Sequence, residues 1–244
     1  MAIIEIKDLR KTYRLGNEKV HALRKINLDI EKGEICCVLG TSGSGKSTLL
    51  NMLAGLEKPT KGSVKINGTE ITTLSEKKLA RFRQDNLGFV FQSYNLLNQL
   101  TALENVAMPL MFRGMSRKKR EAVASKMLKA VGLAERAKHK PSQMSGGQQQ
   151  RVGIARAFVS KPSVIFADEP TGNLDTHTTA EVMNLMVKMC RKHNLTLVLV
   201  THDLEISEYA DRIVHIIDGE ITSIEKRVSK YDLENQEGNK DNEK

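Results

Sequence analysis

The chain has no tryptophan, few aromatic residues and only three cysteines, and each shortage narrows its class. Aromatic residues make up 4% of the 244 positions, so the core must be built from aliphatic side chains. Cys36, Cys37 and Cys190 have the spacing of neither a disulfide framework nor a metal site. Apolar runs such as LTLVLV at 195–200 are much shorter than the roughly 18 residues of a membrane span. The N-terminal stretch MAIIEIKDLRK carries charges within its apolar residues, so no signal peptide is predicted and we expect a cytosolic globular protein.

Acidic residues are in the minority, which leaves a formal net charge of +9. Three explanations fit this excess: binding of nucleic acid, attraction to the anionic inner face of a membrane, or a generally basic surface. The densest run, RKKR at 117–120, is equally compatible with a solvated helix face.

Strand-like segments dominate both ends of the chain and helix-like periodicity dominates its middle. Strands are predicted at 3–9, 26–30, 34–40 and 63–68, and again at 164–168, 195–202 and 212–217. A helix pattern at 178–192 separates two of the later strands. This alternation of apolar strands with helices predicts an α/β fold with a parallel sheet.

The region from about 92 to 158 is predicted to be a helical insertion into this core. Within it, Ser116 is expected to cap a helix that ends at Gly132. Val123, Met127, Ala130 and Val131 are expected to share its apolar face.

A glycine-rich stretch, Gly40-Thr-Ser-Gly-Ser-Gly-Lys46-Ser47, follows an apolar strand and precedes a helix-like segment. It fits G-x-x-x-x-G-K-[ST] in the structural context that gives this pattern its meaning. The glycines allow successive backbone amides to face phosphate oxygens, beside the positive end of the following helix. Lys46 is expected to reach the β- and γ-phosphates, and the Ser47 hydroxyl to bind Mg²⁺.

Further polar residues follow the predicted strands. Asp168 and Glu169 end the strand VIFAD, where Asp168 is expected to hold Mg²⁺ through water and Glu169 to orient the attacking water. His202 follows LTLVLV and is either structural or in contact with the γ-phosphate. Gln92 follows GFVF and is either an ordinary loop amide or a contact to Mg²⁺.

A second glycine pair, in MSGGQ at 144–148, also precedes an apolar helix pattern. Taken alone, Ser145 and the glycines are good helix-cap residues. Their amides would also form an anion site at a helix N-terminus. One nucleotide does not need two phosphate sites in one subunit, so we expect this loop to bind the γ-phosphate held by another copy of the chain.

Taken together, GTSGSGKST, Gln92, MSGGQ, VIFADEP, NLD at 173–175 and His202 resemble the ATP-binding subunit of an ABC transporter, over about residues 3–220. The resemblance implies a P-loop NTPase (RecA-like) core with a mostly parallel sheet, an N-terminal antiparallel β subdomain and an inserted α-helical subdomain. The ATPase domain would cover 1–228, with the core and β subdomain at about 1–91 and 159–228 and the helical subdomain at about 92–158. The polar segment 229–244 is predicted to be a disordered tail.

The resemblance also implies roles for individual residues. Lys46, Glu169 and His202 would be catalytic, and Ser47, Gln92 and Asp168 would hold the metal. ATP would be contacted by Tyr13, which is otherwise a surface aromatic, and by Gly40, Thr41, Ser42, Gly43, Ser44, Gly45, Lys46, Ser47, Thr48, Gln92, Ser145, Gly146, Gly147, Gln148 and Asp175. Met144 stands where the family's signature usually has Leu, a volume-conserving exchange.

The implied protein is a Mg²⁺-dependent ATPase that forms a homodimer around two ATP molecules. It would act on a separate membrane permease at the cytoplasmic face of the membrane, with no nucleic-acid partner. The stretches GFVFQSYNLLNQLTALENVAMPL and SGGQQQRVGIARA resemble the subgroup of macrolide export, lipoprotein release and peptide-antibiotic efflux. An amino-acid importer, a non-transport ATPase of the same superfamily and a nucleotide sensor without hydrolysis stay open as alternatives.

Overall fold

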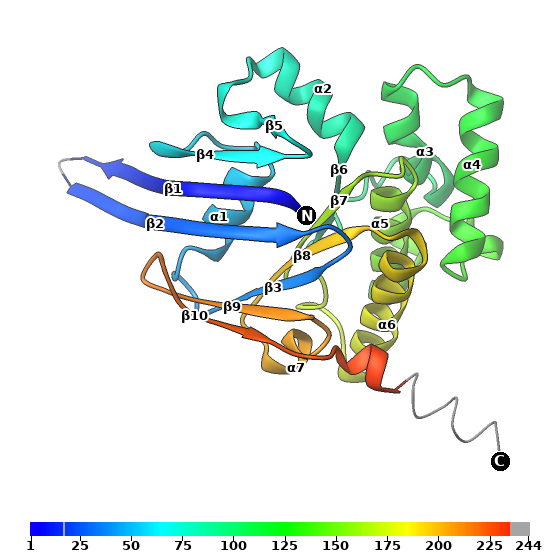
Figure 1. Cartoon of the computed structure of the whole chain (residues 1–244). Helices are drawn as coiled ribbons and strands as arrows, with labels where there is room; N and C mark the ends of the chain where they lie inside the picture. The colour runs from blue at the N-terminus through cyan, green and yellow to red at the C-terminus, as the bar shows by residue number, and fades with distance from the viewer. Residues whose placement is uncertain (17, 235–244) are drawn as a thin grey trace. The chain divides into compact units, whose positions relative to one another are not determined.

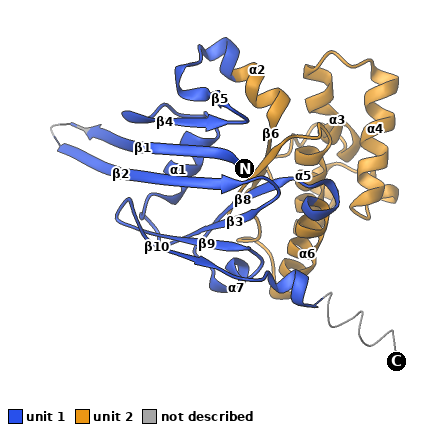
Figure 2. Ribbon diagram, viewed as in Figure 1, with its two compact units in different colours: residues 1–79, 190–244 blue, residues 80–189 orange. Residues whose placement is uncertain are grey.

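The computed structural model describes residues 1–16 and 18–234, which fall into two compact units (Figures 1 and 2). Unit 1 combines Met1–Leu79 with the segment from Cys190 onward, and unit 2 is Ala80–Met189. Unit 2 includes two strands besides its helices because α5 packs against β6. These boundaries differ from the expected helical subdomain at 92–158, and that subdivision stays a prediction.

Unit 1 contains an antiparallel sheet in the order β2-β1-β4-β5. Its strands are β1 (Ala2–Leu15), β2 (Glu18–Glu31), β4 (Lys61–Ile66) and β5 (Thr69–Glu70), followed by the short helix η1 (Ile71–Thr73). Ile26, Leu28 and Ile30 are buried and alternate with exposed polar residues, so one face of β2 is covered. β1 and β2 extend well beyond the predicted strands. Their distal halves form a polar hairpin, and because its sequence has no apolar alternation, the sequence pattern did not predict it.

Unit 1 also contains a set of mostly parallel strands. β3 (Ile35–Leu39) lies between β8 (Thr196–Thr201) and β9 (Arg212–Ile217), parallel to both, and β10 (Glu220–Lys226) is antiparallel to β9. Every residue of β3 and β8 is buried, which explains their continuous apolar sequences. β10 was not predicted, because most of its side chains are exposed and polar. α1 (Lys46–Leu53) follows β3, and α7 (Leu204–Ser207) follows β8.

The three cysteines are core residues of unit 1. Cys36, Cys37 and Cys190 are all buried. Burial raises the pKa of Cys36 and Cys190 to about 12, so both are protonated thiols at neutral pH.

Unit 2 contains three complete α-helices and a pair of parallel strands, β6 (Leu87–Phe91) and β7 (Val164–Asp168). The helices are α3 (Ala102–Phe112), α4 (Arg117–Ala130) and α5 (Gly146–Phe158), with η2 (Ala134–Arg136) and η3 (Pro141–Gln143) between the last two. Thr101 and Glu104 form a reciprocal capping box at the start of α3. α2 (Glu76–Asn86) and α6 (Thr176–His193) each cross a unit boundary.

The apolar face of α4 differs from the predicted one. The helix lies where expected, between Ser116 and Gly132, but its buried residues are Ala124 and Leu128. Val123 and Met127 are only half-buried and Ala130 is exposed, whereas Val131, at the end of the helix, is buried as predicted. The small side chain of Ala124 allows a neighbouring helix to pack closely. A pattern based on large apolar residues does not include this position. Ser116 makes no side-chain hydrogen bond to the helix.

The predicted start of the disordered tail, at residue 229, is too early. Ser229 is fully buried, and the residues after it continue as a helical turn to Glu234 (Figure 1). Arg191, near the end of α6, pairs with Asp211 at 2.5 Å and with Asp232 at 2.7 Å. These ion pairs attach the segment to unit 1. The rest of the predicted tail, 235–244, lies outside the described residues.

Candidate functional site

The predicted site residues fall into two groups, one in each unit. In unit 1, the loop between β3 and α1 is too tight for side chains at key positions. A Cβ at Gly40 would lie 2.3 Å from the carbonyl oxygen of Ile216, and one at Gly45 would lie 2.5 Å from that of Ala22. Gly45 also has a φ of 101°, which disfavours any other residue. Glycine at these positions brings the loop's backbone round to the start of α1.

Two polar side chains of this loop, those of Ser44 and Lys46, are buried. Lys46 is only 7% exposed, and its ammonium donates to the carbonyl oxygen of Thr41 at 2.8 Å. The Ser44 hydroxyl oxygen is buried and has no hydrogen-bond partner within the described chain. Ser47 follows in the first turn of α1 and is exposed. A buried cation, an unsatisfied hydroxyl and a helix N-terminus together form a site suited to phosphate.

Tyr13 on β1 is fixed by its neighbours. Its hydroxyl donates to Glu57 at 2.8 Å, and the Lys11 ammonium lies 5.0 Å from its ring centre. Lys11 also pairs with Glu57 at 2.5 Å. Burial and the hydrogen bond to Glu57 raise the pKa of Tyr13, while a hydrogen bond with Thr48 of α1 opposes them. Tyr13 is therefore linked to the helix that starts at the phosphate loop.

His202 lies beside the phosphate loop. It follows β8, which is parallel to β3, so the two strands end at the same edge. His202 and the loop residues Gly40, Thr41 and Ser42 line one cavity of about 610 Å³. Asp203 caps α7 by accepting from the Glu205 amide at 2.8 Å. The phosphate contact of His202 stays a prediction.

In unit 2, the two strand ends bring polar residues together. Phe91 is paired with Asp168 in the parallel ladder, so Gln92 and Glu169 each follow at the carboxyl end of adjacent strands. Asp168 and Glu169 are half-buried. Glu169 has a φ of 45°, an unusual conformation for a side chain other than glycine. Such backbone strain is concentrated at functional sites.

The second glycine loop forms the start of α5. The Ser145 hydroxyl accepts from the Gln148 amide at 3.3 Å, and the Gln148 side chain accepts from the Ser145 amide at 3.2 Å. Ser145 is therefore a helix cap, as the simpler interpretation predicts. It is also exposed, and its hydroxyl proton remains available to donate. The amides of Gly146 and Gly147 occupy the first turn, where a helix leaves N–H groups without intrahelical partners.

Asp175 lies close to this loop within unit 2. Its carboxylate accepts from the Thr178 amide at 2.9 Å and from the Thr178 hydroxyl at 2.7 Å. Those hydrogen bonds lower the pKa of Asp175. The Thr178 methyl group would lie 2.4 Å from a Cβ at Gly147, so the segment after β7 packs against the glycine loop.

The chemistry of both groups fits a nucleoside triphosphate. The loop in unit 1 supplies a cationic phosphate cradle that a Cβ would obstruct, and unit 2 supplies a second set of helix-terminal amides. Ser47, Gln92 and Asp168 offer hard oxygen donors of the kind that bind Mg²⁺.

A model of the ABC transporter family matches residues 23–172, more than half of the chain. The chain belongs to the ABC transporter family. It is an ATP-binding cassette protein and an ATPase, with the α/β fold of the P-loop NTPases.

Relatives of this ABC ATPase are similar over nearly its whole length. The lipoprotein-releasing system ATP-binding protein LolD of Geobacter metallireducens is 46% identical over 91% of this chain and 99% of its own length. The macrolide export ATP-binding/permease protein MacB of a Shewanella species is 45% identical over 93% of this chain, which spans only 35% of MacB. A solved dimeric structure of the ATP-binding cassette MJ0796, in a post-hydrolysis state bound to ADP and Pi, has 44% identity and a TM-score of 0.85. The similarity covers 91% of this chain and 98% of that one.

Sequence reasoning missed several positioning residues of the ABC ATPase. Gln150 of α5 is fully buried, and its amide donates to the carbonyl oxygens of Phe91, at 3.3 Å, and of Pro170. It thereby connects both strand ends that carry Gln92 and Glu169. Because Gln150 lies in the run QQQ, nothing in the sequence distinguishes it from its neighbours.

Asn173, Lys11 and Glu57 were also missed as site residues. Asn173 donates to the Gln92 carbonyl oxygen at 3.0 Å, while the Gln92 amide donates back to its side chain at 3.5 Å. The proximity of Asn173 to Asp175 in the sequence was the only available signal. Nothing in the sequence pairs Glu57 with Lys11 and Tyr13, which are more than forty residues away.

None of the helices among the described residues is both long and apolar enough to cross a membrane.

Proposed function

We propose that this ATPase is a Mg²⁺-dependent motor subunit that dimerises head to tail around two ATP molecules. In this arrangement, each γ-phosphate joins the phosphate loop of one subunit to Ser145 and Gly147 of the other. The observation that carries the proposal is the second helix start in the same chain, capped by an exposed hydroxyl. The dimeric state of the related cassette MJ0796 supports it.

Each residue has a defined part in hydrolysis. Tyr13 stacks on the adenine, the loop amides and Lys46 hold the phosphates, and Glu169 orients water for in-line attack on the γ-phosphate. His202 contacts the γ-phosphate from the same edge as the loop. Ser47 and Gln92 would supply oxygen ligands for Mg²⁺, and Asp168 would hold the ion through water. When bound, the ion would offset charge on the phosphate oxygens. Loss of the γ-phosphate then removes the contact that joins the subunits.

A groove on unit 2 suits the coupling of this cycle to a permease. A cavity of about 280 Å³ between α3 and α4 is lined by apolar residues, including Leu100 and Met108, and by Arg117 and Glu121. Met111 and Phe112 at the end of α3 are exposed large apolar residues. Most of this surface lies within the region 92–120 that follows Gln92, and we assign it to a cytoplasmic segment of a separate membrane permease. The protein would then lie peripherally at the cytoplasmic face of the membrane.

The transport direction we favour is export or mechanical transmission, of the macrolide, lipoprotein or antimicrobial-peptide type. Its support is the similarity to MacB and LolD. Identification and co-purification of the permease encoded beside this chain distinguishes the possibilities. A four-span permease with a large outer domain or a ten-span permease agrees with this assignment, whereas an amino-acid-type permease would indicate an importer.

Glu169→Gln tests the core of the proposal. The amide keeps the shape of the side chain but cannot accept a proton from water, so phosphate release should fall at least about 100-fold. The variant should still bind ATP and should form an ATP-dependent dimer in size-exclusion chromatography. Lys46→Ala is the control, with weak ATP binding and no dimer.

Turnover at the wild-type rate by Glu169→Gln, without an ATP-dependent dimer, would refute these roles. Failure of the wild type to release phosphate would favour a nucleotide sensor. Tight, salt-sensitive binding of duplex DNA would favour a non-transport ATPase instead.

A further inference from the structure

The positive charge of the chain is concentrated in one segment of unit 2. Residues 117–140 contain nine Lys or Arg and two Asp or Glu, so this segment carries seven of the formal net charge of +9. The rest of the chain is nearly balanced. A generally basic surface therefore does not account for the excess.

Within this segment, α4 presents two different faces. Ala124 and Leu128 are buried in the packing against the neighbouring helices. On the same side of the helix, one or two turns earlier, Arg117 and Glu121 pair with each other at 2.7 Å and line the groove between α3 and α4. Successive residues of a helix are about 100° apart, which places four lysines together on the other side of α4. These form the lysine face: Lys118, Lys119, Lys126 and Lys129.

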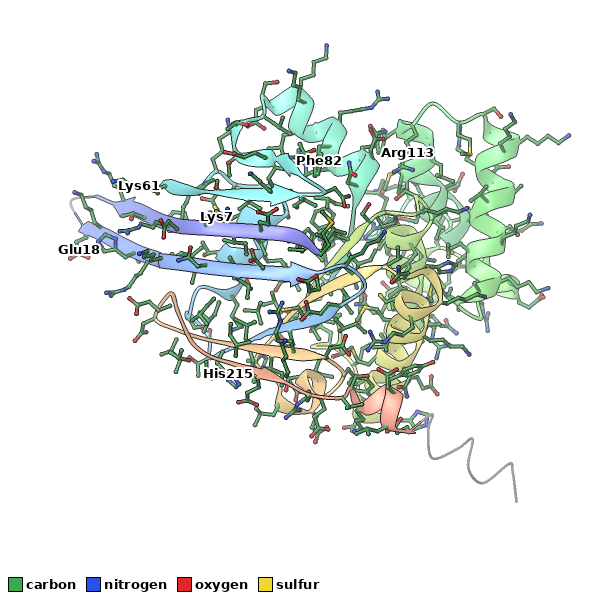
Figure 3. The ribbon with its side chains drawn as sticks, viewed as in Figure 1. Lys7, Glu18, Lys61, Phe82, Arg113 and His215 are labelled. Carbon is green, nitrogen blue, oxygen red and sulfur yellow. The ribbon has the colours of Figure 1, made fainter. Side chains whose placement is uncertain are left out.

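The lysine face contains no acidic residue. All four lysines are exposed, and the exposed residues between them are Ala122, Ser125 and Ala130. Within the part of the chain that the structure describes, none of the four pairs with an acid. Figure 3 shows nitrogen-tipped side chains projecting from α4. The small residues between the lysines allow all four ammonium groups to approach a flat surface together.

We infer that the lysine face binds the anionic headgroups of a phospholipid bilayer. Four lysines spread over about 16 Å of helix match many separate negative charges in a plane. Lysine is a strongly hydrated point charge, which suits diffuse attraction, whereas arginine is preferred for paired phosphate contacts. The face also has no aromatic residue on which a nucleic-acid base would stack. The proposal extends the proposed function, since it gives a peripheral subunit its own contact with the membrane beside the permease.

Co-sedimentation of the full chain with vesicles tests the inference. Vesicles of about 30% phosphatidylglycerol in phosphatidylcholine should bind the protein at low salt, and pure phosphatidylcholine should not. Salt at about 0.5 M should release it, because exposed charges are screened. Replacement of Lys118, Lys119, Lys126 and Lys129 by Gln should weaken partitioning at least about 100-fold.

The matched control replaces four exposed lysines elsewhere with Gln: Lys19, Lys77, Lys78 and Lys192. Both variants lose the same charge, but only the control should keep vesicle binding. ATP hydrolysis, measured in the same samples, should equal that of the wild type in both, so a failure of the ATPase assignment is recognised separately. Equal loss in both variants, wild-type binding by the lysine-face variant, or a preference for duplex DNA over the vesicles would overturn the inference.

Discussion

At the scale of single residues, the side chain of Tyr13 is held in place by two charged neighbours. Lys11 lies against one side of its ring, and Glu57 accepts from its hydroxyl. Burial tends to raise the pKa of Glu57, but hydrogen bonds from Lys11 and Tyr13 lower it overall. Glu57 is therefore ionised at neutral pH.

Glu57→Gln should weaken ATP binding without affecting the chemical step. The amide loses the ion pair with Lys11 and weakens the hydrogen bond with Tyr13, at a cost of about 1 kcal/mol, which is about fivefold in KM for ATP. kcat should stay unchanged because Glu57 is not a phosphate contact. Glu76→Gln, which removes the exposed partner of Lys58, is the control and should leave both constants unchanged. A lower kcat with an unchanged KM would contradict this role.

At the scale of elements, the geometry at the start of α5 is compatible with two roles for Ser145, a helix cap and a contact to the γ-phosphate. Ser145→Asp separates them, because aspartate caps helices as well as serine does but repels phosphate. The variant should keep its thermal stability and lose the ATP-dependent dimer when combined with Glu169→Gln. Thr101→Asp at the equivalent cap of α3 is the control and should dimerise normally. A dimer of Ser145→Asp with wild-type ATP affinity would leave Ser145 as a cap only.

Gln150 connects α5 to the ends of β6 and β7, and its removal should affect stability and catalysis together. Gln150→Leu leaves the buried carbonyl group of Pro170 without this donor, at a cost of about 1–3 kcal/mol in the free energy of unfolding. The melting temperature should fall by about 2–10 °C, and kcat should fall with little change in KM. Gln149→Leu loses only the bond to the Met144 carbonyl oxygen and should have a smaller effect on both. Equal behaviour of the two variants would show that Gln150 positions nothing.

At the scale of the whole molecule, the end of the described chain is part of the fold of unit 1. Truncation after Val228 removes Ser229 and Asp232, and with them the second ion pair of Arg191. Since that pair is only partly buried, the free energy of unfolding should fall by about 1–2 kcal/mol. Truncation after Glu234 should leave it unchanged. Urea unfolding of both truncated proteins checks this. Equal free energies of unfolding would show that residues 229–234 do not stabilise unit 1.

The sequence by itself determined the local chemistry of this protein. Each motif lies at the start or end of a helix or strand, so its predicted role depends on neighbours in the chain. This holds for the loop at 40–47, the acids at the end of VIFAD and the glycine pair at 146–147. Buried strands such as β3 and β8 were equally predictable, because continuous apolar runs have few other uses.

The tertiary structure decided what depends on residues far apart in the chain. Glu57 meets Tyr13, Gln150 meets two strand ends, and Asp232 meets Arg191 through packing that no local pattern encodes. The polar hairpin of β1 and β2 and the exposed strand β10 form because a neighbouring strand satisfies their backbone hydrogen bonds, not because their own sequences are apolar. The same holds for the lysine face: the sequence contains the charges, but only the burial of Ala124 and Leu128 decides which of them point outward together.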